Sequence, residues 1–370
     1  MDVAEKHFVE NGNGIIREFH HYENCPEIDI ECEYKNGEKN GKAKERYYLC
    51  CANDGPDIVF IGEYLNGKKW NGIVNDNLNN NHYELKNGKG YIIDISSECF
   101  YEGEFINGEK NGKGKEYYYY QKGISFEGEY SNGKRHGKGK EFYEDGNLKF
   151  EGIYKYGFKE EGKEYYPVNN EFNGKLYFNG KYKCNVKWDG EGYDKNGNII
   201  FKINNGKGFI KEYKYDYRYG DYYKCSSFEG EYLNGEKHGK GKEYNYNNKK
   251  GKIIFEGEYY EGRRWNGKGK VEEKRNYYDY KETIKFEGEY INGKRKGKAC
   301  NKKGTIIFEG EYFDGQRWNG KGKEYNQKGN IIFEGEYYEG KRWNGKGIEY
   351  IGDEIIFEGE YLNDKKINGK

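Results

Sequence analysis

Aromatic or glycine residues alternate with charged residues in short runs along the chain. Residues 126–130 read Phe-Glu-Gly-Glu-Tyr, and residues 134–142 form a second alternating run. A period of two predicts a β-strand with one apolar and one polar face. Asn132-Gly133 separates the two runs. Asn-Gly is the strongest short hairpin signal, because a type I′ turn requires positive φ at both central residues. The segment therefore predicts a β-hairpin.

This pattern recurs from near residue 8 to the end of the sequence. Shortened copies lie near 8–19, 83–94 and 201–213. Two segments depart from the pattern and are expected to be irregular connectors, 15–31 and 214–226. Such self-similarity is the signature of repeat architectures. We expect a single all-β array over residues 1–370, an elongated, twisted antiparallel meander of repeated β-hairpins in which each unit contacts its neighbours.

A two-residue loop sets the expected register of each hairpin. Counting outward from the loop pairs Tyr130 with Arg135, Gly128 with Gly137, Phe126 with Gly139, Glu127 with Lys138 and Glu129 with His136. The same count pairs Glu229 with Lys240 and Glu287 with Lys298. One face would then carry aromatic rings that lie across bare backbone. The other would carry a ladder of opposite charges, each pair worth roughly 0.2–1 kcal/mol.

All five tryptophans occupy one position of the repeat, eight residues after the glycine of the first strand. Their units contain one additional residue before the next glycine. A longer loop or a bulge would absorb that residue and place Trp265 opposite Tyr259, the position of Arg135 in the shorter unit. The regular placement favours packing between repeats over ligand stacking. The residues assigned to this packing are Phe126, Tyr130, Trp70, Trp188, Trp265, Trp318 and Trp343.

The repeated sequence resembles the MORN repeat. Residues 126–139 carry the likeness, and it is specific because the copies cover nearly the whole chain. The resemblance implies successive hairpins in an antiparallel sheet, and a scaffold at a membrane–cytoskeleton junction or an accessory segment of a lipid kinase or lysine methyltransferase. The connectors are longer than in that family, and several units carry a Trp-Asn insertion. The chain is also similar to the short hairpin repeats of bacterial YwqK-type proteins.

Composition narrows the classes of function. The 370 residues include 64 Lys and Arg and 64 Asp and Glu, so no positive excess is available for binding nucleic acid. An aromatic content of 18% argues against a disordered chain. Six Ser and two Thr leave few hydroxyl nucleophiles. Neither a signal peptide nor an apolar run of about 18 residues is recognisable, so we expect a cytoplasmic protein, peripheral to a membrane or the cytoskeleton.

Phosphate and metal sites are weakly indicated. Three segments match the Gly-x4-Gly-Lys spacing of a phosphate loop but lack the following Ser or Thr: Gly262–Lys268, Gly315–Lys321 and Gly340–Lys346. The one candidate zinc set, His20, His21, Cys25 and Cys32, has no known ligand spacing. The eight cysteines form no Cys-x-x-Cys pair and are expected to be free thiols.

The carboxylates do not point to catalysis. Glu127 and Glu129 recur in equivalent places along the array, each with an expected basic partner. Catalytic carboxylates are instead held in unequal environments. We therefore expect no catalytic residue, no metal and no cofactor, and a protein that is not an enzyme.

Basic pairs recur just after the first turn of several units. They are Lys134-Arg135, Arg263-Arg264, Lys294-Arg295 and Lys341-Arg342. Stacked along one edge, they would attract anionic lipid at about 1 kcal/mol per side chain, although neighbouring glutamates oppose this. The prediction is a scaffold that binds a protein partner through the aromatic face or this basic edge, with a phosphoinositide-binding membrane tether as the alternative. The open strand edge at the C-terminal end also predicts a homodimer.

Overall fold

The chain is described here by a computed structural model. It describes residues 3–4, 12–20, 27–48, 57–77, 79–95, 100–118, 123–168, 173–218, 221–246, 251–277, 280–301, 304–313, 316–326, 330–351, 354–367 and 369. Every helix or strand assigned within these ranges is a strand. Among the same residues, no helix is long and apolar enough to cross a membrane. The expected all-β antiparallel meander of repeated hairpins is confirmed.

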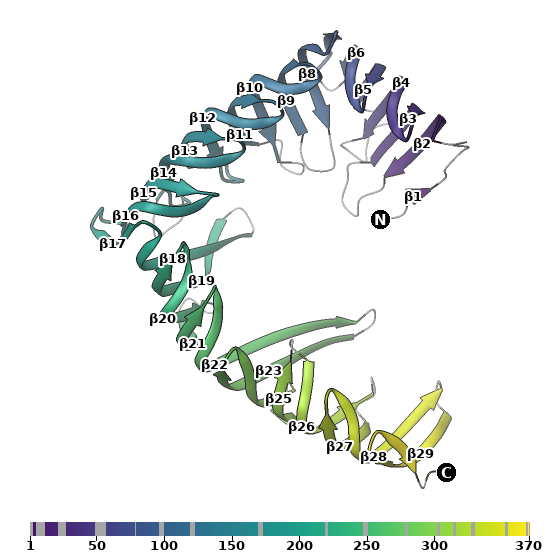
Figure 1. Cartoon of the computed structure of the whole chain (residues 1–370), viewed down its shortest axis with the longest axis vertical. Coiled ribbons are helices and arrows are strands. Elements are labelled where there is room, and N and C mark those ends of the chain that lie inside the picture. Colours follow the sequence, from purple (N-terminus) through teal and green to yellow (C-terminus); the bar gives the residue numbers. More distant parts are fainter. Residues whose placement is uncertain are drawn as a thin grey trace. The chain divides into compact units, whose positions relative to one another are not determined.

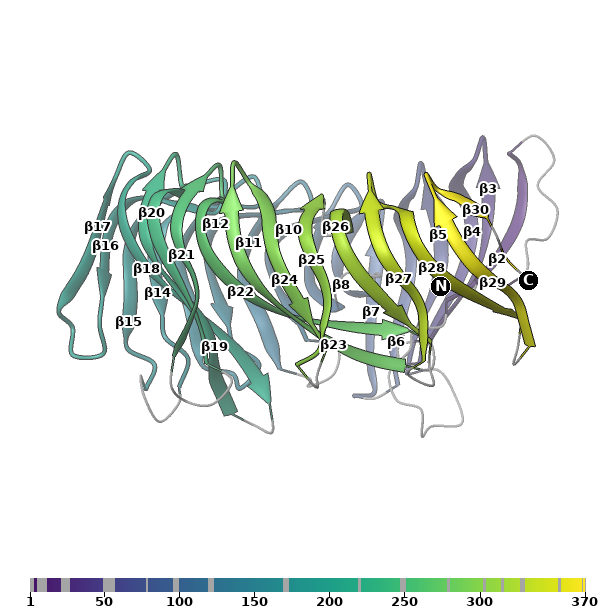
Figure 2. The ribbon, with the colours of Figure 1, turned by 90° about the horizontal axis from the view of Figure 1, so that it is seen from below.

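The chain divides into two units, which are described separately. Unit 1 comprises Met1–Ile200 and Tyr217–Tyr223, and unit 2 comprises Phe201–Asp216 and Lys224–Lys370. Within each unit, successive hairpins lie side by side (Figures 1 and 2). Their strands pair antiparallel, as β11 does with β12 and β25 with β26.

The strands up to β16 lie in unit 1. They are β1 Val3–Ala4, β2 Gly14–His20, β3 Glu27–Lys35, β4 Glu38–Tyr48, β5 Ile58–Leu65, β6 Lys68–Asp76, β7 Asn81–Lys86, β8 Lys89–Ile95, β9 Phe100–Ile106, β10 Glu109–Tyr117, β11 Ile124–Ser131, β12 Lys134–Phe142, β13 Leu148–Lys155, β14 Phe158–Tyr165, β15 Leu176–Lys183 and β16 Val186–Tyr193.

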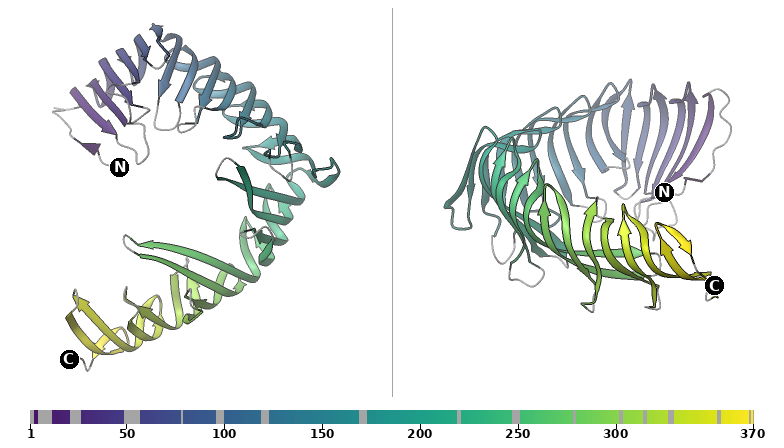
Figure 3. Two further views of the ribbon diagram at one scale, coloured as in Figure 1. Left: turned by 180° about the vertical axis from the view of Figure 1, so that it is seen from behind. Right: turned by 60° about the horizontal axis from the view of Figure 1, so that its bottom comes forward.

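Three strands contain residues of both units, and those after them belong to unit 2. The three are β17 Ile199–Asn204, β18 Lys207–Arg218 and β19 Asp221–Leu233. The others are β20 Glu236–Asn245, β21 Lys252–Tyr260, β22 Arg263–Tyr277, β23 Tyr280–Ile291, β24 Lys294–Cys300, β25 Ile306–Phe313, β26 Gln316–Tyr325, β27 Ile331–Tyr338, β28 Lys341–Ile351, β29 Glu354–Leu362 and β30 Lys365–Ile367. The hairpin of β22 and β23 extends beyond its neighbours in unit 2 (Figure 3).

The segments expected as irregular connectors are largely strand, so that expectation is wrong. Residues 14–20 and 28–34 form a regular antiparallel pair between β2 and β3. Most of 214–226 lies in β18 and β19. These segments lack the glycine and glutamate pattern of the repeat but keep apolar and aromatic residues that favour strands.

The two-residue turns are confirmed. Asn132 and Gly133 have φ values of 50° and 77°, as a type I′ turn requires. The turns also join neighbouring hairpins, because the turn glycine donates its amide hydrogen to a carbonyl of the preceding hairpin. Gly133 donates to Lys110 at 2.9 Å, and Gly157 donates to Arg135 at 2.8 Å.

In the hairpin of β11 and β12, the expected register holds only next to the turn. Tyr130 pairs with Arg135 as predicted, but Gly128 pairs with Gly139 rather than Gly137. Phe126 accordingly pairs with Glu141, Glu127 with Lys140, and Glu229 with Lys242. A bulge in the second strand accounts for the shift of two residues. At its centre Gly137 has a φ of +67°, a conformation that glycine adopts without the steric cost of other residues.

The bulge brings two glycines beneath one aromatic ring. A methyl group on Gly128 or Gly139 would lie 2.8 or 2.6 Å from Cζ of Phe126, so a side chain there would displace the ring. The hairpin of β23 and β24 has Ala299 in the place of Gly139 and keeps the regular register without a bulge. Its predicted pair, Glu287 with Lys298, is confirmed.

The tryptophan hairpins also differ from the expectation. Tyr259 pairs with Arg264 and not with Trp265, and Gly257 pairs with Gly267. A one-residue bulge after Arg264 therefore absorbs the additional residue.

The core is a column of rings on one face of each unit. Phe126, Phe150 and Phe178 of unit 1 are fully buried, as are Phe255 and Phe333 of unit 2. Each ring meets tyrosines edge to face; Phe126, for example, lies 5.7 Å from Tyr130 and 5.2 Å from Tyr154 of the next hairpin. The opposite face carries exposed ion pairs such as Lys323–Glu334 at 2.7 Å, which contribute little stability singly.

Candidate interaction surface

A partly buried glutamate of one hairpin binds a tyrosine and a cation of the next. Glu116 of β10 accepts a hydrogen bond from Tyr130 at 2.8 Å and forms an ion pair with Arg135. The arrangement recurs in both units: Glu141 with Tyr154 and Lys159, Glu324 with Tyr337 and Arg342, and Glu349 with Tyr361 and Lys366. These clusters hold adjacent hairpins together on the aromatic face.

The arginines of the predicted basic edge take part in this packing. Their guanidinium carbons lie 4.0–5.3 Å from the ring centres of the preceding strand's phenylalanines: Arg135 over Phe126, Arg264 over Phe255, Arg295 over Phe286 and Arg342 over Phe333. A cation over an aromatic face is attracted by the ring quadrupole. The four arginines are accordingly only partly exposed.

The other half of the predicted basic edge points away from the rings. Lys134, Arg263, Lys294 and Lys341 are exposed beside their turns. Consecutive residues of a strand face opposite sides of the sheet, so each basic pair is divided between the two faces. The eight residues therefore do not form one surface.

In the hairpin of β5 and β6, in unit 1, a lysine takes the place of the arginine and is more deeply buried. Lys69 forms ion pairs with Glu45 at 2.8 Å and with Asp94 at 2.6 Å. Glu45 also accepts hydrogen bonds from Tyr47 and Tyr64, each at 2.5 Å. Burial by itself would raise the pKa of Glu45, but Lys69, Lys39 and the hydrogen bonds outweigh it and bring the pKa to about 2. Burial would lower the pKa of Lys69, but Asp94 and Glu45 raise it well above the usual value.

The buried and partly buried glutamates predict that acid destabilises the fold. Burial opposes ionisation at Glu116, Glu141, Glu164, Glu243 and Glu324, but cations and hydroxyl donors lower their pKa values, as they do for Glu45. Carboxyl groups whose pKa is lower in the folded state stabilise it above about pH 4.5, and this contribution is lost as the pH falls towards 2. We expect the melting temperature to fall over this range in thermal scans, with Glu45 contributing about 3 kcal/mol. A constant melting temperature from about pH 5 to 3 would contradict this.

The described residues offer no cluster of metal-ligating side chains. No group of three or more His, Cys, Asp or Glu side chains there could hold a metal ion. Of the candidate zinc set, His21, Cys25 and the His20 side chain lie outside the described part. Burial raises the pKa of the Cys32 thiol to about 11, and the thiol donates a hydrogen bond to the carbonyl of Glu33. Cys32, Cys184, Cys225 and Cys300 are free thiols, whereas Cys25, Cys50, Cys51 and Cys99 are outside the described residues.

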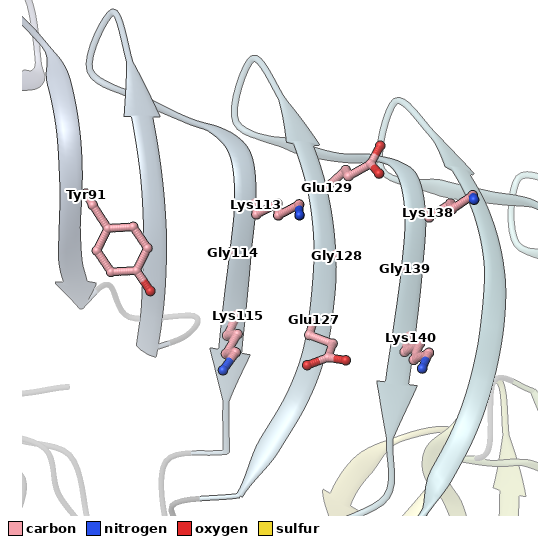
Figure 4. A pocket seen from close by; sticks show the side chains of 10 residues that line it. All are labelled: Tyr91, Lys113, Gly114, Lys115, Glu127, Gly128, Glu129, Lys138, Gly139 and Lys140. Carbon is pink, nitrogen blue, oxygen red and sulfur yellow. The ribbon is translucent and has the colours of Figure 1, made fainter.

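An open pocket of about 330 Å³ lies on the charged face of unit 1 (Figure 4). Backbone of Gly114, Gly128 and Gly139 lies along it, between rows of lysines and glutamates, and Tyr91 lies beside it. Lys115 pairs across the strands with Glu127, and Glu127 with Lys140. Opposite charges therefore offset one another along the pocket, which offers no distinct binding chemistry.

An exposed apolar row distinguishes unit 2. In the six hairpins formed by β19 to β30, the residue before the turn is apolar and is 38–53% exposed: Leu233, Tyr260, Ile291, Phe313, Tyr338 and Leu362. We call these six residues the apolar edge row. The corresponding positions of unit 1 include Lys35, Ser131, Lys155 and Lys183. A contiguous exposed apolar patch marks an interaction surface.

Tryptophans widen this row. Trp265 lies 5.2 Å from Tyr260, Trp318 lies 5.0 Å from Phe313, and Trp343 lies 5.1 Å from Tyr338, with interplanar angles of 43–47°. In unit 1, the residue before the turn of the tryptophan hairpins is not aromatic. It is Leu65 in the hairpin of Trp70 and Lys183 in that of Trp188. The Lys183 ammonium lies 4.5 Å from the ring centre of Trp188.

The tryptophans also contact the next turn. The carbonyl of Trp265 accepts a hydrogen bond from Gly293 at 2.9 Å, and that of Trp318 accepts one from Gly340 at 3.0 Å. The apolar edge row was not predicted from the sequence. Its signal was an apolar residue before every turn from 233 to 362.

Comparison with known families agrees with this architecture. The sequence model of the MORN repeat matches residues 33–48, 101–119, 126–148, 228–249 and 286–300. These five segments of the chain are MORN repeats. No curated protein matches it significantly.

Proposed function

We propose that this MORN-repeat chain is a non-catalytic scaffold that binds a protein partner through the apolar edge row of unit 2. MORN repeats are consistent with a scaffold involved in binding. The observation that carries the proposal is the run of six exposed apolar residues on successive hairpins. The proposed location is the cytoplasmic side of a membrane–cytoskeleton junction.

The charges beside the row favour a protein over an anionic membrane. Among the described residues of the turns that carry the row and the residues directly after those turns, the exposed cations are Arg263, Lys294, Lys341 and Lys365, and the exposed anions are Glu236, Glu261, Glu339 and Asp364. Lys341 and Asp364 form an ion pair at 3.1 Å. Attraction to anionic lipid requires a local positive excess, which four cations and four anions do not provide.

The proposal is tested with a variant in which Tyr260, Phe313 and Tyr338 are each replaced by Ser. These side chains are exposed, so the fold should be retained. The matched control replaces Leu65 and Ile106, exposed residues at the same repeat position of unit 1, by Ser. We expect crosslinking in extract of the source cells to capture a protein with the native chain and the control, and not with the triple variant.

Other outcomes would replace the proposal. Equal capture by all three proteins would exclude the apolar edge row as the contact. Salt-sensitive sedimentation of the native chain with phosphoinositide vesicles, without a protein partner, would establish the membrane tether instead. A dimeric mass by light scattering that the triple variant abolishes would identify a second copy as the occupant.

A further inference from the structure

We infer that the segment bound by the apolar edge row is proline-rich and adopts the polyproline II conformation. The inference rests on the proposed scaffold function and specifies its partner. It is carried by the ring pairs Tyr260–Trp265, Phe313–Trp318 and Tyr338–Trp343. Grooves lined by aromatic side chains are the recognised docking sites for polyproline II segments.

The shape of each ring pair suits a proline. The two rings are inclined by 43–47°, with centres 5.0–5.2 Å apart, so each pair forms two walls of a shallow angle rather than a flat stack. Phe313 and Tyr338 are about half exposed, and their tryptophans are partly exposed. A compact apolar ring can therefore contact both walls at once.

The tryptophan rings lie close to the turn glycines of the next hairpin. A methyl group on Gly293 would lie 3.2 Å from the ring of Trp265, and one on Gly340 would lie 3.6 Å from that of Trp318. The backbone of the next turn thus supports each ring and helps to fix its angle to Tyr260 or Phe313. The turn conformation, with φ of +77° and +81°, also favours glycine.

The spacing of the hairpins matches the pitch of polyproline II. Neighbouring strands lie about 4.8 Å apart, so equivalent positions of successive hairpins are about 9.6 Å apart. Polyproline II has three residues per turn and a rise of about 3.1 Å, which gives about 9.3 Å per turn. The length of one turn of the ligand therefore matches the spacing between successive hairpins to within about 0.3 Å. Two turns of an α-helix span about 10.8 Å, an error of more than about 1 Å per hairpin.

Hydrogen bonding and charge agree with such a ligand. A polyproline II backbone forms no internal hydrogen bonds, so its carbonyls can accept from a binding surface. Among the described residues, none accepts a hydrogen bond from the indole nitrogens of Trp265, Trp318 and Trp343, which are donors only. The balanced charges of the turn residues fit an uncharged segment, as described above.

The test is titration of the full chain, followed by tryptophan fluorescence. The probe is a peptide of about six Leu-Pro-Pro triplets, and the comparison is a helix-forming peptide of equal length made of Leu, Ala and Lys. We expect saturable binding of the proline peptide, at least about tenfold tighter than that of the helical peptide.

Two substitutions test whether the proline peptide binds at the apolar edge row. Phe313→Ser should weaken binding of the proline peptide by at least about tenfold, because it removes one exposed wall. Ile106→Ser, at the same repeat position in unit 1, should leave the affinity unchanged. Absence of binding, equal or tighter binding of the helical peptide, or an undiminished affinity of Phe313→Ser would each overturn the inference.

Different experiments test the scaffold function and the nature of its partner, so that one can be rejected without the other. If the proline peptide does not bind but the triple variant still loses its captured protein, the scaffold stands and the polyproline II inference falls. If the triple variant captures the same proteins as the native chain, both the proposed function and the polyproline II inference are wrong.

Discussion

Replacing Lys69 by Met is expected to lower the free energy of unfolding of unit 1 by about 3–5 kcal/mol. Lys69 is only 6% exposed, and its ammonium contacts the carboxylates of Glu45 and Asp94. Glu45 is 1% exposed, so the substitution leaves a buried negative charge without its nearest cation. Burying an unpaired charge is among the most costly single changes in a protein. Urea unfolding followed by circular dichroism measures the loss.

The adjacent lysine provides the control. The side chain of Lys68 is 46% exposed and forms an ion pair with Glu109 at 2.7 Å. Exposed ion pairs contribute about 0–1 kcal/mol, so Lys68→Met should be nearly neutral. Adding Glu45→Gln to Lys69→Met should recover part of the loss, because it removes the unpaired charge. Equal effects of Lys68→Met and Lys69→Met would show that the buried cluster does not stabilise unit 1.

Replacing Phe150 by Ala is expected to cost about 3–5 kcal/mol. The ring is fully buried, and the Lys159 ammonium lies 4.2 Å from its centre. Gly152 and Gly162 pair beneath it, and a methyl group on either would lie 2.5–2.6 Å from Cζ. Neighbouring side chains cannot fill the space, because the glycines offer only backbone. Removing the ring therefore leaves a cavity between two hairpins.

The control is a phenylalanine of the same hairpin. Phe158 is 47% exposed, and Phe158→Ala should change the free energy of unfolding by less than about 1 kcal/mol. Both variants are compared by urea unfolding. Hydrogen exchange should show the loss of protection in Phe150→Ala to be greatest in β13, β14 and their neighbouring strands, since repeats are stabilised mainly by adjacent units. A similar loss in both variants would argue against the ring column as the core.

Local signals in the sequence were sufficient to predict the strands and turns of the hairpins. Alternation over 126–130 predicted a strand, and Asn132-Gly133 predicted its turn. Both are interactions of a few neighbouring residues, and both are confirmed. The pairing of Tyr130 with Arg135, one step from the turn, is also confirmed for this reason.

These local signals could not predict the strand register farther from the turn. The shift that pairs Gly128 with Gly139 depends on a bulge at Gly137 and on the Phe126 ring that covers both paired glycines. A repeat with Ala299 in the place of Gly139 has no bulge. The hairpin of β3 and β4 has Ala43 in the same place and keeps the bulge, so the residue at this position does not by itself decide the register.

The sequence by itself determined the repeat, the all-β class and the turns, because these follow from the order of neighbouring residues. Only the tertiary structure decided which basic residues face the rings, that Lys69 of β6 meets Glu45 of β4 and Asp94 of β8, and that Trp265 lies against Tyr260. Each of these contacts joins residues of different strands. Their formation depends on bulges and on strand pairing, which set the side of the sheet that a side chain occupies.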